Sequence, residues 1–172
     1  MKKQLSLAAG LAGFILIPLA MAAQPQTIGW IEHVTVQPGD ITLKAKIDTG
    51  ADNSSVHAKD INIYERDGVK WVSFTVENRQ GKNASFDLPV VRMANIKRKG
   101  AEPLVRPVVT MDLCIGGTLK TANINLANRE NFKYPMLIGR SYLKDQYLVD
   151  SGKQYTAQAT CNSDTLAQDE TL

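Results

Sequence analysis

The sequence predicts an all-β protein whose strands form a small barrel or a sandwich. Short β-rich segments alternate with turn residues along most of the chain. In residues 71–77, Val72, Phe74 and Val76 alternate with Trp71, Ser73, Thr75 and Glu77, which is the period of a strand with one buried face. No helical pattern extends beyond about two turns. These three observations favour strands joined by short turns over a helical architecture.

Turn residues mark the boundaries of the expected strands. Pro38-Gly39-Asp40 separates the first two strands, and Asp67-Gly68 is a strong signal for a two-residue hairpin. Gly116-Gly117 indicates another hairpin, and a short helix is expected after Gly139, at residues 140–144. The expected strands cover residues 28–36, 41–47, 61–65, 71–77, 84–91, 107–115 and 119–126.

Length and charge describe one ordinary globular domain. The chain has 172 residues, a formal charge of +3, and 44% hydrophobic and 22% charged residues. Without the first 23 residues it would have 149 residues, too few for two lobes of about 100 residues or more each. The near-neutral charge argues against a dedicated nucleic-acid-binding protein. We expect one domain over residues 24–161 and a flexible, polar C-terminal tail over residues 162–172.

Residues 1–23 have the three parts of a secretory signal peptide. Lys2 and Lys3 form a basic start, residues 5–19 are apolar, and small residues end the segment at Ala22 and Ala23. An uncleaved membrane anchor is the alternative, since the apolar stretch nearly has the length of a bilayer span. We expect cleavage, export to a bacterial periplasm, and no stable membrane insertion afterwards.

Cys114 and Cys161 are the two cysteines of the chain. Export would place both in an oxidising compartment, where they permit one intramolecular disulfide. The alternative is a buried free thiol at Cys114, which lies in an apolar run.

The tetrapeptide Asp48-Thr49-Gly50-Ala51 directly follows an expected strand. Glycine permits backbone angles that a tight loop needs, and the threonine hydroxyl can brace the loop while Asp48 faces a cleft. Alone, the tetrapeptide is also compatible with an ordinary turn. A second segment, Met136-Leu137-Ile138-Gly139-Arg140, is an apolar strand that ends in Gly-Arg.

The pairing of KIDTGA at residues 46–51 with MLIGR at residues 136–140 resembles the retropepsin-like aspartic proteases. The resemblance is closer to a bacterial branch often labelled "ATP-dependent zinc protease". That branch shares IGWIE at residues 28–32, RPVV at residues 106–109 and NRENFKYPMLIGR at residues 128–140. It also shares the pairs His57-Ala58 and, within LVD, Val149-Asp150.

The resemblance implies a closed six- or seven-stranded acid-protease barrel with one short helix. It makes Asp48 the catalytic carboxylate, and it assigns support of the active-site loop to Thr49, Gly50, Ala51, Gly139 and Arg140. The mechanism needs two adjacent carboxylates that share one proton. No second Asp-Thr-Gly occurs, and Asp150-Ser151-Gly152 imitates it without a following apolar-apolar-Gly segment. We therefore expect Asp48 of a second copy to complete the pair in a homodimer.

A flap over the cleft is expected from the same resemblance. The hairpin over residues 71–91, with its tip at residues 78–83, lies in a suitable part of the chain, although an ordinary surface hairpin fits equally well. A basic cluster consists of Arg92, Lys97, Arg98, Lys99 and Arg106. It could attract an acidic peptide, or it could guard the edge of a sheet with charges.

The zinc and ATP in the family label have no counterpart in these residues. The chain has two histidines, His33 and His57, and no HExxH, Cys-x-x-Cys or phosphate-binding Gly-rich loop. His57 with Asp52 or Asp60 could hold a metal in principle, but we expect no metal and no cofactor. The sequence thus predicts a periplasmic aspartic-type endopeptidase acting on a peptide or protein. The alternatives are an inactive peptide- or partner-binding module on the same fold, and a zinc hydrolase.

Overall fold

The structure, a computed structural model, describes residues 24–98 and 100–161. Within these residues the fold is almost entirely β, with a single four-residue helix, as the sequence predicts. The first six strands are β1 (Gln26–Gln37), β2 (Ile41–Ile47), β3 (Ser54–His57), β4 (Lys59–Arg66), β5 (Val69–Glu77) and β6 (Asn83–Pro89). The later elements are β7 (Arg92–Arg98), β8 (Ala101–Ile115), β9 (Thr118–Ala127), β10 (Met136–Ile138), α1 (Arg140–Leu143) and β11 (Tyr147–Gln154).

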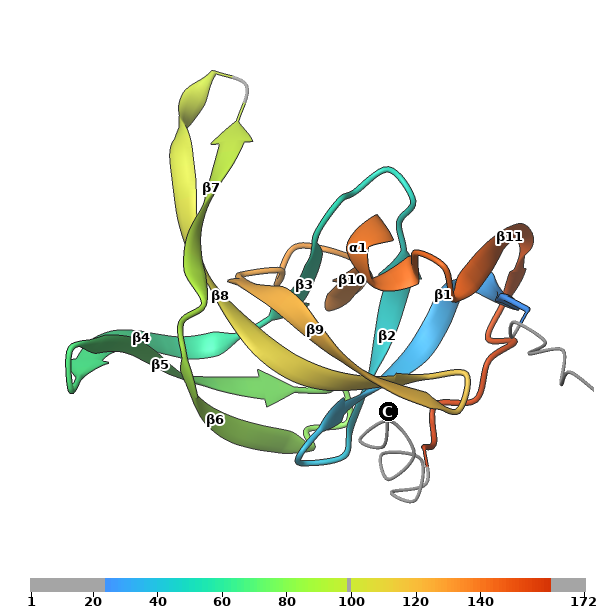
Figure 1. Ribbon diagram of the computed structural model, residues 1–172, viewed down its shortest axis with the longest axis horizontal. Coiled ribbons are helices and arrows are strands. Elements are labelled where there is room, and N and C mark those ends of the chain that lie inside the picture. The colour runs from blue at the N-terminus through green and yellow to red at the C-terminus, as the bar shows by residue number, and fades with distance from the viewer. Residues whose placement is uncertain (1–23, 99, 162–172) are drawn as a thin grey trace, which may run out of the picture.

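Eight strands form one large sheet that closes on itself (Figure 1). Their order is β11-β1-β2-β10-β3-β9-β8-β7, and β8 also pairs with β1. Strands β4, β5 and β6 form a second, three-stranded sheet beside it. The ring that the β1–β8 pairing closes consists of β1, β2, β10, β3, β9 and β8, while β11, β7 and the second sheet lie outside it.

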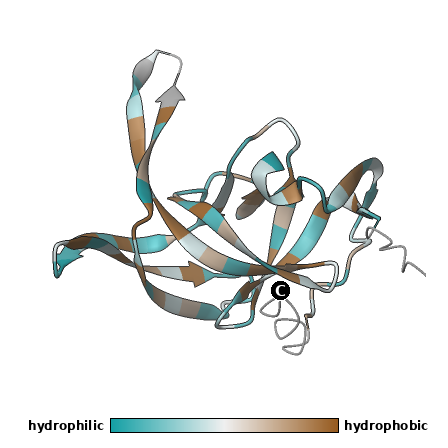
Figure 2. Cartoon of the chain, viewed as in Figure 1, coloured by the Kyte–Doolittle hydropathy of each residue, from teal (hydrophilic) through white to brown (hydrophobic). Residues whose placement is uncertain are grey.

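Alternation along β2 separates a core face from an outer face. Ile41, Leu43, Ala45 and Ile47 are buried and belong to the main apolar core. The lysines between them project from the opposite face, as the period of a strand requires. Figure 2 shows the resulting mixture of apolar and polar positions along the strands. The residue that follows this strand, Asp48, therefore leaves the sheet from a strand that the core holds firmly.

The predicted turns are present. Asp67 and Gly68 both have positive φ, 51° and 74°, in the β4–β5 hairpin, where the sequence pair was expected to turn the chain. Gly116 and Gly117, with φ of 63° and 80°, join β8 to β9. The apolar strand expected before Gly139 is present as β10, whereas the sequence missed β3, which is short, and β7, which is strongly charged.

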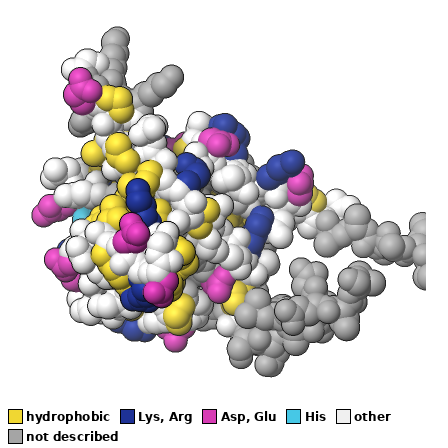
Figure 3. Space-filling model, turned by 60° about the vertical axis from the view of Figure 1, so that its left-hand side comes forward, with side chains coloured by type: hydrophobic (Ala, Val, Ile, Leu, Met, Phe, Trp, Pro, Cys, Tyr) yellow, Lys and Arg dark blue, Asp and Glu magenta, His cyan; other side chains and the backbone are white. Residues whose placement is uncertain are grey.

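Strands β7 and β8 extend beyond the sheet as a hairpin arm (Figure 1). Charged residues of the predicted basic cluster lie on it, and β7 forms an edge of the large sheet. Lys99 lies outside the described residues. Apolar side chains gather below the arm among charged ones on the face shown in Figure 3. The exposed apolar residues of the arm are Leu104 and Val105 on β8, with Val91 just before β7. Ile61 and Ile63 are exposed on β4.

The hairpin expected to be a flap is β5–β6, and its tip does not cover Asp48. Lys82 at the tip donates from Nζ to the Asp40 carbonyl oxygen at 2.6 Å, and Arg79 donates to the Lys133 carbonyl oxygen at 2.7 Å. Asp40 precedes β2, whereas Asp48 follows it. The tip is therefore held at the opposite end of β2 from Asp48, and the flap interpretation is wrong.

The last described segment crosses back over β1 after β11. Glu32, fully buried, accepts hydrogen bonds from the backbone N–H and hydroxyl of Thr156 and from the backbone N–H of Ala157. A disulfide joins Cys114 to Cys161, with their Cα atoms 5.8 Å apart. The segment is thus attached at both its start and its end.

Residues 1–23, expected to be a signal peptide, and residues 162–172, expected to be a flexible tail, lie outside the described part of the chain. In the described residues, no helix has the length and apolar character that a bilayer span requires.

Candidate active site

The loop that begins with Asp48 is threaded between two remote segments. β10 pairs in parallel with β2 and in the antiparallel direction with β3, so it lies between the two strands that the loop connects. Asp48 donates its backbone N–H to the Ile138 carbonyl oxygen at 2.8 Å. The two motifs, predicted to pair, are therefore in direct contact through their backbones. Asp48 and Gly139 are 91 residues apart in the sequence.

Within the loop, the backbone turns around the Asp48 side chain. Gly50 donates its N–H to Asp48 Oδ1 at 3.1 Å, and Ala51 donates its N–H to the Asp48 carbonyl oxygen at 3.1 Å. A Cβ atom at Gly50 would lie 3.2 Å from Asp48 Oδ1. A side chain at position 50 would therefore press on the carboxylate that the loop presents.

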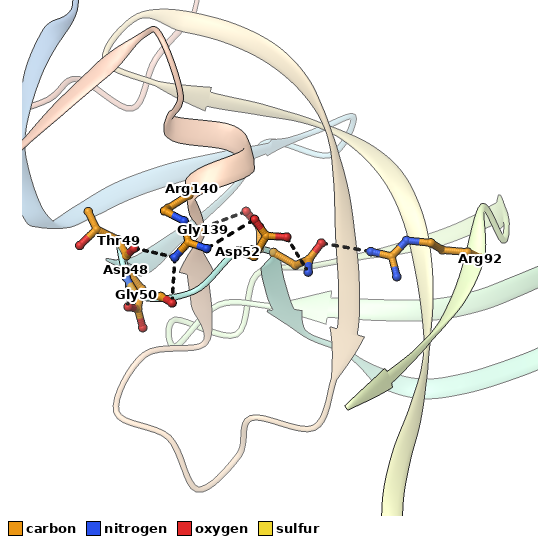
Figure 4. A network of polar contacts seen from close by, with 9 residues as sticks. Asp48, Thr49, Gly50, Asp52, Arg92, Gly139 and Arg140 are labelled. Atoms are coloured by element: carbon orange, nitrogen blue, oxygen red, sulfur yellow. Dashed lines mark hydrogen bonds and ion pairs between the residues drawn. The ribbon is translucent and has the colours of Figure 1, made fainter. Parts of the chain in front are cut away.

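Arg140 ties the loop to the start of α1 (Figure 4). Its guanidinium donates to the carbonyl oxygens of Thr49 and Gly50 at 2.9 and 3.0 Å, and its backbone N–H donates to Ala51 at 2.9 Å. An ion pair of 3.7 Å with Asp52 adds a further contact. Thr49 takes part in this network through its backbone carbonyl, and not through the hydroxyl considered at first.

Gly139 lets two backbones approach each other closely. A Cβ atom there would lie 2.7 Å from the Asp52 oxygen and 2.7 Å from the Asn53 carbonyl carbon. The Gly139 N–H donates to the hydroxyl of buried Ser54 at 3.1 Å. The structure thus brings together every residue that the sequence assigned to support of the loop.

Lys46 was not singled out from the sequence, and it contacts the candidate catalytic carboxylate. Its Nζ lies 3.1 Å from Asp48 Oδ2, and the Asp48 side chain is 23% exposed. Burial raises the pKa of Asp48, but the hydrogen bond and charge of Lys46, with the N–H groups of Gly50 and Ala51, hold it below its ordinary value. The signal for Lys46 was present in the sequence, because residues two positions apart in an extended chain have side chains on the same face, and Asp48 directly follows β2.

Arg129 is a second cation that the sequence did not assign to the site. It is buried, and its guanidinium donates to the Ser55 hydroxyl at 3.0 Å and to the Tyr134 carbonyl oxygen at 3.2 Å. Burial and the charge of Arg106 lower the pKa of Arg129, whereas the charge of Asp48 raises it. Arg129 therefore belongs to the electrostatic surroundings of Asp48, although the loop of residues 128–135 carries it.

One open pocket borders the loop, and a second lies beside Arg129. One of about 540 Å³ is lined by Thr49, Asp52, residues of α1 and the start of β11. The other, of about 230 Å³, lies over Arg129, His57 and the exposed ring of Phe132. The larger pocket gives an extended chain room next to the loop that carries Asp48.

Asp150 differs from Asp48 in its surroundings. Its Oδ1 accepts the Gly152 N–H at 2.9 Å, which reproduces the loop geometry at Asp48, and Lys153 lies 3.0 Å from its Oδ2. It belongs to β11, where it pairs with Gly29 of β1. β11 supplies none of the segments that thread the Asp48 loop, since these come from β10 and α1.

The residues considered for a metal have other partners. His57 accepts the backbone N–H of Arg129 through Nδ1 at 2.9 Å, and Asp52 pairs with Arg140. Over the described ranges, three or more His, Cys, Asp or Glu side chains nowhere gather as metal ligands would.

Comparison with known proteins yields several relatives. Curated proteins from Shewanella pealeana, Shewanella halifaxensis and Desulfotalea psychrophila, each named probable alpha-L-glutamate ligase, are 33%, 32% and 30% identical to this chain. The matches cover 65–66% of this chain but 25% of each relative. This chain thus spans about a quarter of the length of these curated relatives.

A solved structure and a family model match more completely. A Legionella pneumophila protein of unknown function is 33% identical, with a TM-score of 0.67, and the match covers 77% of this chain and 98% of that one. The model of a RimB-like family, described as retropepsin-like aspartic endopeptidase RimB, matches residues 27–160, which include the Asp48 loop and its Gly139–Arg140 support. The chain therefore belongs to the RimB-like family of retropepsin-like aspartic endopeptidases.

Proposed function

We propose that this protein is an aspartic-type endopeptidase that hydrolyses peptide bonds with paired Asp48 carboxylates of a homodimer. The observation that carries the proposal is the position of the Asp48 loop. Hydrogen bonds from the loop to β10 and from Arg140 to the loop hold it beside an open pocket. A fixed carboxylate at the rim of a groove is the arrangement that general base catalysis requires. Family membership supports the same reaction.

The reaction needs one ionised and one protonated carboxyl group. The ionised Asp48 removes a proton from water, and the resulting hydroxide adds to the peptide carbonyl carbon. The protonated Asp48 of the second copy gives its proton to the carbonyl oxygen, which leaves a tetrahedral diol. Transfer of a proton to the amide nitrogen then breaks the C–N bond and releases an amine and a carboxylic acid.

The second carboxylate comes from a second copy, because the chain contains a single Asp-Thr-Gly. A two-fold axis next to the loop would place the two Asp48 side chains together. The surface beside the loop suits such a contact, since the larger pocket is lined by apolar residues of α1 and β11 and Leu148 is 58% exposed. Dimerisation in the closed retropepsin-like barrel would cover this surface.

An acidic peptide is the substrate that the charges favour. Lys46 contacts Asp48. Arg129 interacts electrostatically with Asp48, and Arg106 lies near enough to lower the pKa of Arg129. A peptide carrying Glu or Asp beside the scissile bond would offset these cations. The proposed location is the periplasm, in agreement with the predicted signal peptide and with a disulfide between Cys114 and Cys161.

The ligase name of the curated relatives does not decide against this proposal. Three quarters of each of those proteins lies outside the match, and that part has room for a different activity. The family model, by contrast, matches residues 27–160 of this chain.

Substitution of Asp48 tests the proposal. Cleavage of a peptide library by the full chain should fall by about 10³-fold or more in Asp48→Asn, since the base is removed while shape is kept. Asp150→Asn is the matched control, because Asp150 makes the same contact with a glycine two residues later and should keep wild-type activity. Wild-type cleavage by Asp48→Asn would refute the proposal.

A binding module on the same fold is the second candidate. In the single chain, the Asp48 carboxylate is already occupied by Lys46 and Gly50. A protein that stays monomeric at micromolar concentration and binds acidic peptides without cutting them would establish this alternative. Sizing of the protein during the cleavage assay separates the two candidates.

A further inference from the structure

Lys46 places an ammonium group on the carboxylate to which the proposed function assigns catalysis. Lys46 is the last residue but one of β2 and Asp48 directly follows the strand, so the two are two positions apart in nearly extended chain. The Lys46 Nζ lies 3.1 Å from Asp48 Oδ2. The Asp48 side chain is 23% exposed and the Lys46 side chain 44%, so the pair is half-buried and solvent screens it in part.

The two oxygens of the carboxylate have different partners. Oδ1 accepts the Gly50 N–H, which the loop geometry fixes. Oδ2 accepts from Lys46. The partner of Oδ2 is a side chain that can move aside, whereas the partner of Oδ1 belongs to the backbone. Oδ2 is thus the oxygen that can bind the attacking water or hold a proton, and the Lys46 ammonium group competes with both.

We infer that Lys46 is a positioning residue that orients Asp48 Oδ2 and shifts to lower pH the range in which the paired carboxylates hold their single proton. The inference rests on the proposed function. In a two-fold pair, two ammonium groups would face two carboxylates. Each ammonium favours the ionised form, so both carboxylates lose their protons at lower pH than they would without Lys46.

Other charged groups around Asp48 act from a greater distance. Arg129, after β9, shares an electrostatic interaction with Asp48. Arg140 of α1 bonds to the loop carbonyls and pairs with Asp52. Lys46, by contrast, donates from its side chain directly to the Asp48 carboxylate. Its contribution can therefore be separated from theirs by a single substitution.

The experiment compares Lys46→Met and Lys46→Arg with wild type in the full-length dimer. Lys44→Met is the matched control, because Lys44 lies on the same strand and face but rests over the Tyr155 ring at 5.6 Å. The pH dependence of kcat/KM on a library peptide is measured between about pH 3 and pH 8. The Asp48 carboxyl carbon is titrated in parallel by NMR, which requires no activity.

Lys46→Met should move both limbs of the bell-shaped profile upward by about one pH unit, and the NMR titration of Asp48 should move in the same direction. Lys46→Arg and Lys44→Met should follow wild type. A Lys46→Met profile and titration that superimpose on those of wild type would overturn the inference. Loss of the proposed function has a different signature, because Asp48→Asn would then retain cleavage whatever Lys46 does.

Discussion

Gly139→Ala tests whether close backbone contact positions the Asp48 loop. The added Cβ would lie 2.7 Å from two backbone atoms of Asp52 and Asn53, about 0.7 Å inside ordinary van der Waals contact. These atoms belong to the backbone and cannot rotate away as the end of a flexible side chain would. The loop and β10 must therefore separate, which would weaken the bond from Asp48 N–H to the Ile138 carbonyl.

Overpacking of this kind costs about 1–3 kcal/mol of the free energy of unfolding. For a domain of this size, we expect the melting temperature of Gly139→Ala to fall by about 3–10 °C. Cleavage should fall further than the fraction of folded protein explains, since the carboxylate is displaced as well. Thermal unfolding followed by circular dichroism and a peptide cleavage assay at a temperature where both variants are folded measure the two effects.

Ser141→Ala is the control, because Ser141 is exposed in the same short helix. It should change the free energy of unfolding by less than about 0.5 kcal/mol. A Gly139→Ala protein with the wild-type melting temperature and wild-type cleavage would show that the contact does not position the loop.

Three further predictions concern stability. Glu32→Gln should lower the free energy of unfolding by about 2–4 kcal/mol, since the NH₂ group of glutamine would face buried N–H donors. Amide exchange at Thr156 and Ala157 should become faster, and unchanged exchange would contradict this prediction. Reduction of the disulfide, which spans a sequence separation of 47, should cost about 4 kcal/mol in urea unfolding, and identical midpoints with and without reductant would exclude it. Because folding lowers the pKa of Asp48, its carboxylate stabilises the fold above the unfolded pKa of about 3.9, and this contribution disappears as pH falls through the folded value. The stability difference between wild type and Asp48→Asn should therefore shrink on acidification, and a difference that does not vary with pH would refute the assignment.

Local signals in the sequence were enough for the hairpins, and the family resemblance of two motifs was needed for the active-site loop. Asp67-Gly68 and Gly116-Gly117 turn the chain where positive φ is needed, and neighbouring residues settle such turns. The Asp48 tetrapeptide and Gly139 were likewise recognisable as motifs. The short strand β10 was recognised by its apolar run before Gly139, but its three residues did not indicate which strands it would pair with.

The flap prediction failed for a tertiary reason. Hairpin β5–β6 has the alternation and the turn of a flap, but alternation says nothing about where its tip rests. Contacts of Lys82 with Asp40 and of Arg79 with Lys133 decide that, and each joins segments more than 40 residues apart. The arm formed by β7 and β8 lies nearer to the site, where Arg92 donates to Asn53 at 3.0 Å (Figure 4).

The sequence by itself determined the β class, the position of the candidate catalytic Asp48 and the glycine that its loop requires. These depend on side-chain alternation and on backbone angles, which neighbouring residues control. The tertiary structure alone decided the insertion of β10 between β2 and β3 and the approach of Arg129 to the electrostatic field of Asp48. Strand order and the burial of charged side chains depend on contacts between segments that are far apart in the sequence, and a local sequence pattern does not specify such contacts.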